Sequence, residues 1–178
     1  MRDYITNGPI SLRKYRLGDE FALFDGVSES IKELTQWGFY HAGFTIEDAK
    51  ADVVSRIADW AEGSSYTFLI EALPGPLFVG NCGISEFEPE RNRAALGWWV
   101  RTSKTGRGIA TAAGRLVARA AFEDLNLASL LIYTNANNRA SRRVAEKIGA
   151  VLMKIKPEED GRFCAVYELK PEDLRLEQ

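Results

Sequence analysis

Residues 101–114 read RTSKTGRGIATAAG and combine the residue types that bind phosphate groups. Gly106 and Gly108 come directly before an alanine-rich stretch with helical spacing, so unpaired backbone N–H groups would gather at the positive end of that helix. Three positive charges lie within the same seven residues, on Arg101, Lys104 and Arg107. The pattern predicts a phosphate site; the alternative is a tight turn whose glycines only relieve strain. Neither a P-loop nor an N-terminal G-x-G-x-x-G is present, so neither common nucleotide-binding motif fits.

The elements around this loop are short and mixed. Apolar residues at helical spacing predict helices after an N-cap at Thr45, from Ile109 to Asn126 and from Arg139 to Gly149, with one or two short helices before Trp37. Seven runs read as strands: 10–16, 66–72, 78–87, 94–100, 130–134, 151–155 and 163–169. The run 130–134 is apolar throughout, as in a strand buried on both faces. This order predicts a mixed α/β or α+β sheet with helices packed on its faces.

Composition limits the classes of function. We expect one domain over residues 1–178, because 178 residues with 46% hydrophobic and 27% charged side chains are ordinary for a single globular unit. The net charge of −2 favours neither nucleic acid nor an anionic membrane as a partner. One histidine and two cysteines exclude the usual zinc sets and a disulfide framework. With no apolar secretory segment or 18-residue apolar window, we expect a cytoplasmic protein without a metal.

Three segments of the chain are informative together: ALGWWVR at 95–101, TGRGIATAA at 105–113 and NRASRRVAEKIGA at 138–150. They resemble one family, the GNAT acyl-CoA-dependent N-acetyltransferases, and within it the RimJ/RimL branch that acetylates the N-termini of ribosomal proteins. The resemblance covers nearly the whole chain. It implies the GNAT fold, a mixed, largely antiparallel sheet of about six to seven strands with helices on both faces.

The resemblance also implies a site for acetyl-CoA as cosubstrate. In the family, the loop that matches 104–111 binds the pyrophosphate through backbone N–H groups, and the strand that matches 98–101 pairs with the pantetheine arm. A position matching Asn138 contacts the same arm. The expected cofactor-binding residues are Trp99, Val100, Arg101, Lys104, Gly106, Arg107, Gly108, Ile109, Ala110, Thr111, Asn138 and Ser141.

The catalytic half matches the family less well. Ala95 and Ala145 stand where many relatives carry a glutamate and a tyrosine, and Ser103 replaces a longer polar residue of the loop. Acetyl transfer to an amine requires a group that accepts the ammonium proton. Glu86 and Glu88 are the candidates, with transfer through water as the alternative and solvated surface carboxylates as the non-catalytic one.

Two further groups complete the expected chemistry. Ser141 matches a serine near the thioester sulfur and is expected to protonate the departing thiolate; the alternative is a residue that only caps the helix or binds the cofactor. The Val100 N–H is expected to stabilise the carbonyl oxygen. His41 lies among aromatic residues that could form core or an acceptor pocket. Cys82 and Cys164 read as small buried hydrophobic residues.

The acceptor is set by residues about 24–44 and by polar loops that carry no transferable motif. The resemblance favours a protein or peptide N-terminus; a small amine such as a polyamine, an aminoglycoside or an amino acid is the alternative. Two other functions stay open: an acyl-CoA sensor without turnover, and a nucleotide or RNA binder. Relatives in this branch are often dimers, so a homodimer is a further expectation.

Overall fold

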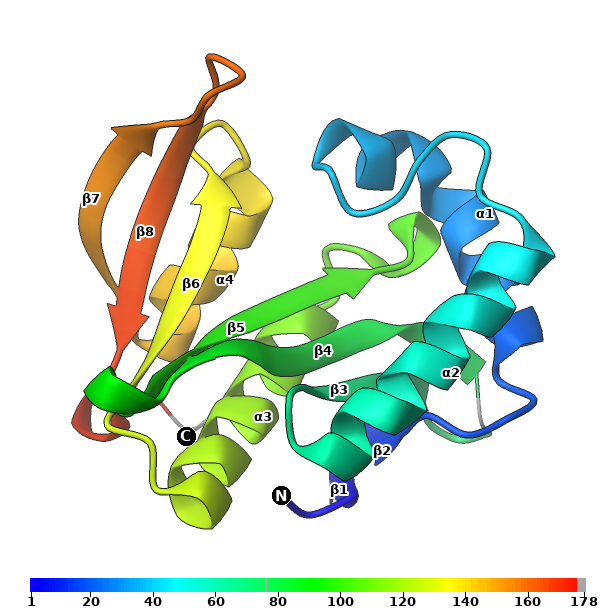
Figure 1. The fold of residues 1–178 in the computed structure, drawn as a ribbon, viewed down its shortest axis with the longest axis horizontal. Helices are drawn as coiled ribbons and strands as arrows, with labels where there is room; N and C mark the ends of the chain where they lie inside the picture. The colour runs from blue at the N-terminus through cyan, green and yellow to red at the C-terminus, as the bar shows by residue number, and fades with distance from the viewer. Residues whose placement is uncertain (76, 176–178) are drawn as a thin grey trace.

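In the computed structural model, which describes residues 1–75 and 77–175, the chain forms one eight-stranded sheet and four α-helices (Figure 1). The strands are β1 (Tyr4–Asn7), β2 (Ile10–Lys14), β3 (Tyr66–Ala72), β4 (Leu77–Glu88), β5 (Arg93–Val100), β6 (Ser129–Asn135), β7 (Val151–Pro157) and β8 (Phe163–Leu169). The helices are α1 (Glu20–Gln36), α2 (Ile46–Glu62), α3 (Ile109–Leu125) and α4 (Arg139–Ile148), with short 3-10 turns η1 (Pro89–Arg91), η2 (Thr102–Lys104) and η3 (Pro171–Asp173).

The sheet is mixed and largely antiparallel, as the sequence predicts. Its order is β1-β2-β3-β4-β5-β6-β8-β7, and β5 and β6 are the one parallel pair among the described strands. The described strands number eight, where the resemblance implied six to seven. The strand missed from the sequence is β1, whose four residues are too few to show an alternating pattern.

The parallel pair separates early. β5 and β6 pair at only three positions, with Arg93, Ala94 and Ala95 opposite Ser129, Leu130 and Leu131. Beyond these positions the two strands diverge, so the sheet opens into two arms (Figure 1). One arm consists of β1 to β5, and the other arm consists of β6, β8 and β7.

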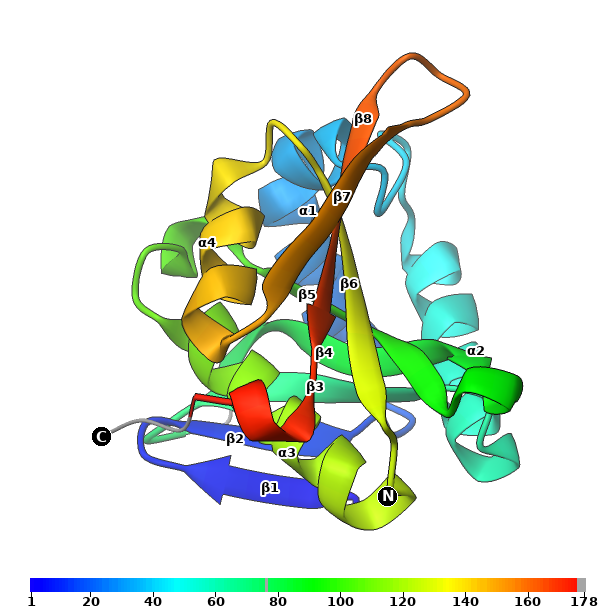
Figure 2. The ribbon, with the colours of Figure 1, turned by 90° about the vertical axis from the view of Figure 1, so that its left-hand side faces the viewer.

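Helices cover both faces of the sheet. α3 and α4 pack on one face, where Val117, Ala121 and Ile148 are fully buried, and α1 and α2 pack on the other (Figure 2). Trp98 joins the core under α3 and Trp99 joins the core under α1 and α2. The opposite orientation of these neighbouring tryptophans, predicted from strand alternation, is therefore confirmed.

Local signals placed the helix ends well. α2 begins with a capping box, in which Thr45 Oγ1 accepts the Asp48 N–H and Asp48 accepts the Thr45 N–H, and it ends at Gly63 in the left-handed region. Asn126 and Gly149 end α3 and α4 in the same region. The segment before Trp37 forms a single helix, α1. None of the described helices combines the length and apolar character needed to cross a membrane.

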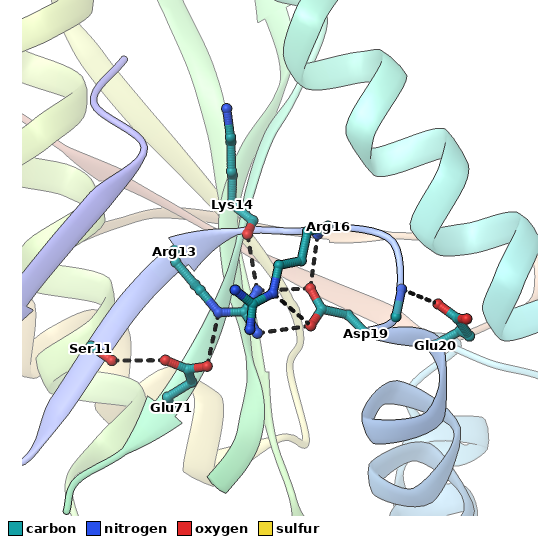
Figure 3. A network of polar contacts seen from close by, with 8 residues as sticks. Ser11, Arg13, Lys14, Arg16, Asp19, Glu20 and Glu71 are labelled. Carbon is teal, nitrogen blue, oxygen red and sulfur yellow. Dashed lines mark hydrogen bonds and ion pairs between the residues drawn. The ribbon is translucent and has the colours of Figure 1, made fainter. Parts of the chain in front are cut away.

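A buried ionic network fixes the start of α1 against the sheet (Figure 3). The Arg13 guanidinium of β2 donates to both carboxylate oxygens of Asp19, at 2.7 and 2.8 Å, and to Glu71 of β3 at 2.8 Å. Asp19 also accepts the Arg16 N–H at 2.8 Å, and Glu71 accepts the Ser11 hydroxyl at 3.2 Å. Asp19 and Glu71 are only 6% and 8% exposed, so each depends on Arg13 for its counter-charge.

Replacing Arg13 should therefore cost stability out of proportion to one side chain. We expect Arg13→Ala to lower the free energy of unfolding by about 3 kcal/mol or more, because it leaves buried Glu71 without a cation and buried Asp19 with only the distant, exposed Arg16. Urea unfolding followed by circular dichroism measures the change. The control Arg16→Ala removes an exposed arginine 3.9 Å from the same Asp19 and should cost about 0.5 kcal/mol or less. Equal losses in the two variants would contradict this account of the network.

Candidate functional site

The gap between the arms of the sheet opens into a cleft with a volume of about 1320 Å³. Its walls come from β5, β6, the second half of α1, the loop before α3, the first turns of α4 and the β7–β8 hairpin. Most residues expected from the sequence line it: Trp99, Val100, Lys104, Gly106, Gly108, Ile109, Ala110, Thr111, Asn138, Ser141 and Glu86. Segments far apart in the chain thus meet at one place.

The edge of β5 that faces the cleft offers backbone hydrogen-bonding groups. The Arg101 N–H donates to the Val79 carbonyl of β4 at 2.9 Å. Because successive residues of a strand alternate in direction, the polar groups of Val100 and Trp98 point away from β4. On that side β6 has already separated, since its pairing with β5 stops at Ala95. An extended ligand could therefore pair with β5 in place of a strand.

The loop before α3 presents a second set of N–H groups. Gly106 and Gly108 adopt the left-handed region, with φ of 74° and 80°, which only glycine enters without strain. Within the described residues, none of the backbone N–H groups from Gly106 to Thr111 has a hydrogen-bond partner. They lie at the positive end of a 17-residue helix, a geometry suited to an anionic group such as a phosphate.

The Arg101 side chain does not take the place expected of it. Its guanidinium turns away from the cleft to α1, where it donates to Asp25 at 2.7 Å and to Glu29 at 2.9 Å, and it is only 11% exposed. Two carboxylates of one helix attract the guanidinium more strongly than open solvent does. Arg101 is thus a positioning residue, and the expectation of a direct ligand is wrong for its side chain. Arg107, also expected as a ligand, is exposed and lies outside the lining of the cleft.

α1 also holds the backbone of this loop. The Glu29 carboxylate accepts the Ser103 N–H at 3.0 Å, and the Ser30 hydroxyl accepts the Thr102 N–H at 3.0 Å. The hydrogen bonds from Ser103, together with those from Arg101, hold the pKa of Glu29 at about 2. The loop geometry therefore depends on a helix more than 70 positions earlier in the chain.

The opposite wall begins with a capped helix. Asn138 Oδ1 accepts the Ser141 N–H at 3.0 Å, so the N-x-x-S spacing serves as the N-cap of α4. Both residues nevertheless line the cleft, and in the described part of the chain the Ser141 hydroxyl has no partner. Asn138 keeps its amide N–H₂ group for a ligand. One side chain thus both starts the helix and faces the cleft.

The two candidate carboxylates, Glu86 and Glu88, lie in different surroundings. Glu86 lies in a bulge of β4, at a φ of 52° that is unusual for a residue with a side chain, and it lines the cleft. Glu88 lies outside the lining and pairs with Arg93 at 2.8 Å and with Arg91 at 3.2 Å. The hydrogen bond from Arg93 lowers the pKa of Glu88. Of the two predicted bases, Glu86 thus faces the cleft, and Glu88 lies outside its lining in an ion pair with Arg93.

Several cleft residues escaped the sequence analysis. Tyr133 lies in the run expected to be buried on both faces, yet it is 43% exposed and lines the cleft. Arg143 and Lys147 also line it, and their spacing of four on one helix face was the available signal. Phe163 comes from a strand end that carries no motif. Trp37 and Phe39 also line the cleft; they are among the aromatic residues around His41 that were expected to form either core or the wall of an acceptor pocket.

The remaining candidates from the sequence divide between core, surface and cleft. His41 is exposed, lies 3.4 Å from Asp48 and is not part of the cleft lining. Cys82 is fully buried as predicted, and burial raises the pKa of its thiol. Cys164 differs from the prediction, because it is half-buried and faces the cleft.

Known proteins resemble this chain in sequence and in fold. The acetyltransferase (GNAT) domain family matches residues 10–151. YdaF of Bacillus subtilis (strain 168), provisionally assigned as a ribosomal N-acetyltransferase, is 29% identical over 148 residues, which are 81% of this chain and 79% of that protein.

Two solved structures share the fold at low sequence identity. The ribosomal-protein-S5-alanine acetyltransferase from Vibrio fischeri has a TM-score of 0.86 and 14% identity, covering 97% of this chain and 99% of its own. RimL, a ribosomal L7/L12 α-N-protein acetyltransferase in complex with coenzyme A, has a TM-score of 0.87 and 19% identity, covering 94% and 97%. The chain thus shares its overall fold with both structures.

The anchoring of the loop by α1 should depend on pH. The pKa of Glu29 is about 2 in the folded chain against an ordinary value of 4.5, so the charged carboxylate stabilises the fold above about pH 4.5 and loses this effect as the pH falls towards 2. We expect Glu29→Gln to lower the free energy of unfolding by about 1 kcal/mol at pH 7. The difference from wild type should shrink over the same pH interval, measured by urea unfolding at a series of pH values.

A matched control is Glu90→Gln, which removes an exposed carboxylate at the other end of β5. It should change stability little at any pH. A pH-independent loss in Glu29→Gln would show that the carboxylate charge is not what anchors the loop.

Proposed function

Because the chain belongs to the acetyltransferase (GNAT) domain family, we propose that it transfers the acetyl group of acetyl-CoA to a primary amine, the acceptor being the N-terminus of a protein or peptide. The observation that carries the proposal is the separation of β5 and β6 beside the uncapped N-terminus of α3. A strand edge and a helix N-terminus in one cleft fit a ligand with an extended amide arm and a diphosphate. Acetyl-CoA has both parts.

The arrangement of polar groups supports one orientation of acetyl-CoA. Its pyrophosphate would accept the N–H groups from Gly106 to Thr111, with Lys104 beside it. The pantetheine amides would pair with the Trp98 and Val100 backbone. This path brings the thioester to the base of the cleft, between β5, Asn138 and Ser141. Arg143 and Lys147 add positive charge to the wall on the α4 side.

We propose direct attack within a ternary complex. The Glu86 carboxylate takes a proton from the bound ammonium group directly or through one water, and the neutral amine nitrogen then attacks the thioester carbonyl carbon and releases its second proton to water. Negative charge that develops on the carbonyl oxygen is met by the Val100 N–H. The C–S bond then breaks, and the departing sulfur takes a proton from the Ser141 hydroxyl, which regains one from water. Glu86 would thereby act as the base in place of the glutamate that many relatives carry at the position of Ala95.

Ligand-dependent thermal unfolding tests the cofactor half. Acetyl-CoA and CoA at about 100 times their dissociation constants should each stabilise the protein by about 2.7 kcal/mol and raise Tm by several degrees. ATP at the same concentration should leave Tm unchanged, because it lacks the arm that pairs with β5. If neither acetyl-CoA nor CoA raises Tm, the glycine loop is only a tight turn and the proposal is wrong.

Steady-state kinetics tests the catalytic half. Glu86→Gln should lower kcat by about 100-fold if the carboxylate is the base, and Glu88→Gln should leave it near the wild-type value. Ser141→Ala should lower kcat, and the Tm shift with CoA should persist in all three variants. Wild-type turnover by Glu86→Gln would assign the proton transfer to water alone.

A further inference from the structure

Exposed aromatic side chains surround the part of the cleft beyond the expected thioester position. Phe39, Tyr133 and Phe163 are 51%, 43% and 54% exposed, and Trp37 is half-buried beside them. They come from the loop after α1, from β6 and from β8, so three distant segments contribute to one apolar rim. Aromatic rings left open to solvent around a cleft favour a ligand that covers them.

The same part of the cleft holds little uncompensated negative charge. Glu158 pairs with Lys156 at 3.2 Å, and Asp160 pairs with Arg162 at 2.5 Å. Glu33 accepts the Thr102 hydroxyl, which follows the far end of β5. Glu86 is then the one carboxylate of the described cleft lining at the acceptor end that has neither a cation nor a hydrogen-bond donor beside it. Glu33, which the Thr102 hydroxyl holds, and Glu86 are thus the carboxylates of the described lining without a cation, and Glu86 alone is free of a hydrogen-bond donor to bind an ammonium group.

Tyr133 of β6 and Glu86 of β4 line the same cleft. Burial raises the pKa of the Tyr133 hydroxyl; the carboxylates of Glu88 and Glu86 raise it as well, and Arg93 and Lys156 lower it. The hydroxyl therefore stays protonated at neutral pH, and its oxygen can accept a hydrogen bond from an ammonium group that approaches Glu86. The ring of the same residue is part of the apolar rim.

The mouth of the cleft is narrow at one point. A Cβ atom added at Gly38, in the loop after α1, would lie 4.0 Å from Arg162 Nη2 in the loop between β7 and β8. The two loops thus approach each other across the cleft. A slender chain end fits such an opening better than a branched or multi-ring molecule.

Resting on the proposed function, we propose that the acceptor is a peptide N-terminus with an apolar side chain within its first two residues. The ammonium group binds between Glu86 and Tyr133, and the following side chains contact Phe39 and Phe163. Two extended residues span about 7 Å, enough to reach from the base towards the rim. Polyamines and aminoglycosides carry several positive charges and would meet the unpaired cations Lys104, Arg143 and Lys147 of the described lining, so the cleft selects against them.

An acceptor panel tests this directly. Release of free CoA thiol is followed with peptides of one sequence that differ only in residue one or two, which is leucine, phenylalanine, aspartate or lysine. Spermidine, an aminoglycoside and an N-terminally blocked peptide complete the panel. We expect kcat/KM for the apolar-leading peptides to exceed that of the aspartate and lysine peptides, and of spermidine, at least tenfold.

Variants connect that preference to the rim. Phe163→Ala should lower kcat/KM for the apolar-leading peptide about tenfold and change it for the aspartate peptide by less than about twofold. Tyr133→Ala also loses the hydroxyl, so it should lower kcat/KM for both peptides, and about tenfold more for the apolar-leading one. Tyr133→Phe should keep the apolar preference and raise KM for every amine. Controls are Phe21→Ala, which removes a phenylalanine that is 65% exposed outside the cleft, and Tyr4→Phe on β1. Both should behave as wild type.

The outcomes separate the inference from the proposed function. Spermidine or the aminoglycoside as the best acceptor, or an apolar preference unchanged in Phe163→Ala and Tyr133→Ala, would overturn the inference and leave acetyl transfer standing. Binding of acetyl-CoA without acetylation of any amine would overturn both. Because Tyr133 and Phe163 are exposed, Tm of the Phe163→Ala and Tyr133→Ala variants should match that of the wild type. A loss of activity without a loss of stability is then attributable to the aromatic rim.

Discussion

Backbone polar groups in a sheet must find partners, and two neighbouring strands of this protein cannot give them to each other. β5 and β6 pair at three positions and then diverge, which leaves the outward N–H and C=O groups of β5 facing a cleft. An unpaired buried backbone group costs about as much as a lost hydrogen bond, so this edge favours a ligand that pairs like a strand. The candidate functional site is the part of the cleft where β5 has no neighbouring strand to pair with.

Much of the remaining structure holds that gap in shape. α1 is fixed at its start, where Asp19 accepts two hydrogen bonds from Arg13, and again along its length, where Glu29 and Ser30 accept hydrogen bonds from the loop before α3. The loop before α3, which we propose binds the pyrophosphate, is thus connected through α1 to β2 and β3. Arg101 has a comparable role, because its guanidinium pairs with Asp25 and Glu29 of α1 and does not face the cleft.

Charge is divided along the cleft. Lys104 lies in the loop before α3, Arg143 and Lys147 line the wall formed by α4, and none of the three forms an ion pair with a described residue. At the acceptor end the carboxylates are mostly paired with neighbouring cations, and Glu86 stands apart in a bulge of β4. An anionic cofactor and a cationic amine would therefore enter from opposite ends, with their reactive atoms meeting where β5 and β6 separate.

The sequence alone determined what depends on neighbours within a few residues: the capping box at Thr45, the glycine loop before α3, the ends of α3 and α4, and the opposite faces of Trp98 and Trp99. Tertiary structure decided which way Arg101 points, that Glu86 and not Glu88 reaches the cleft, and that Tyr133 leaves the core. Each of these depends on groups brought close by folding: Asp25 and Glu29 for Arg101, the β4 bulge and Arg93 for the glutamates, and the separation of β6 from β5 for Tyr133. Periodicity and motif spacing describe one segment at a time, so they carry no information on those partners.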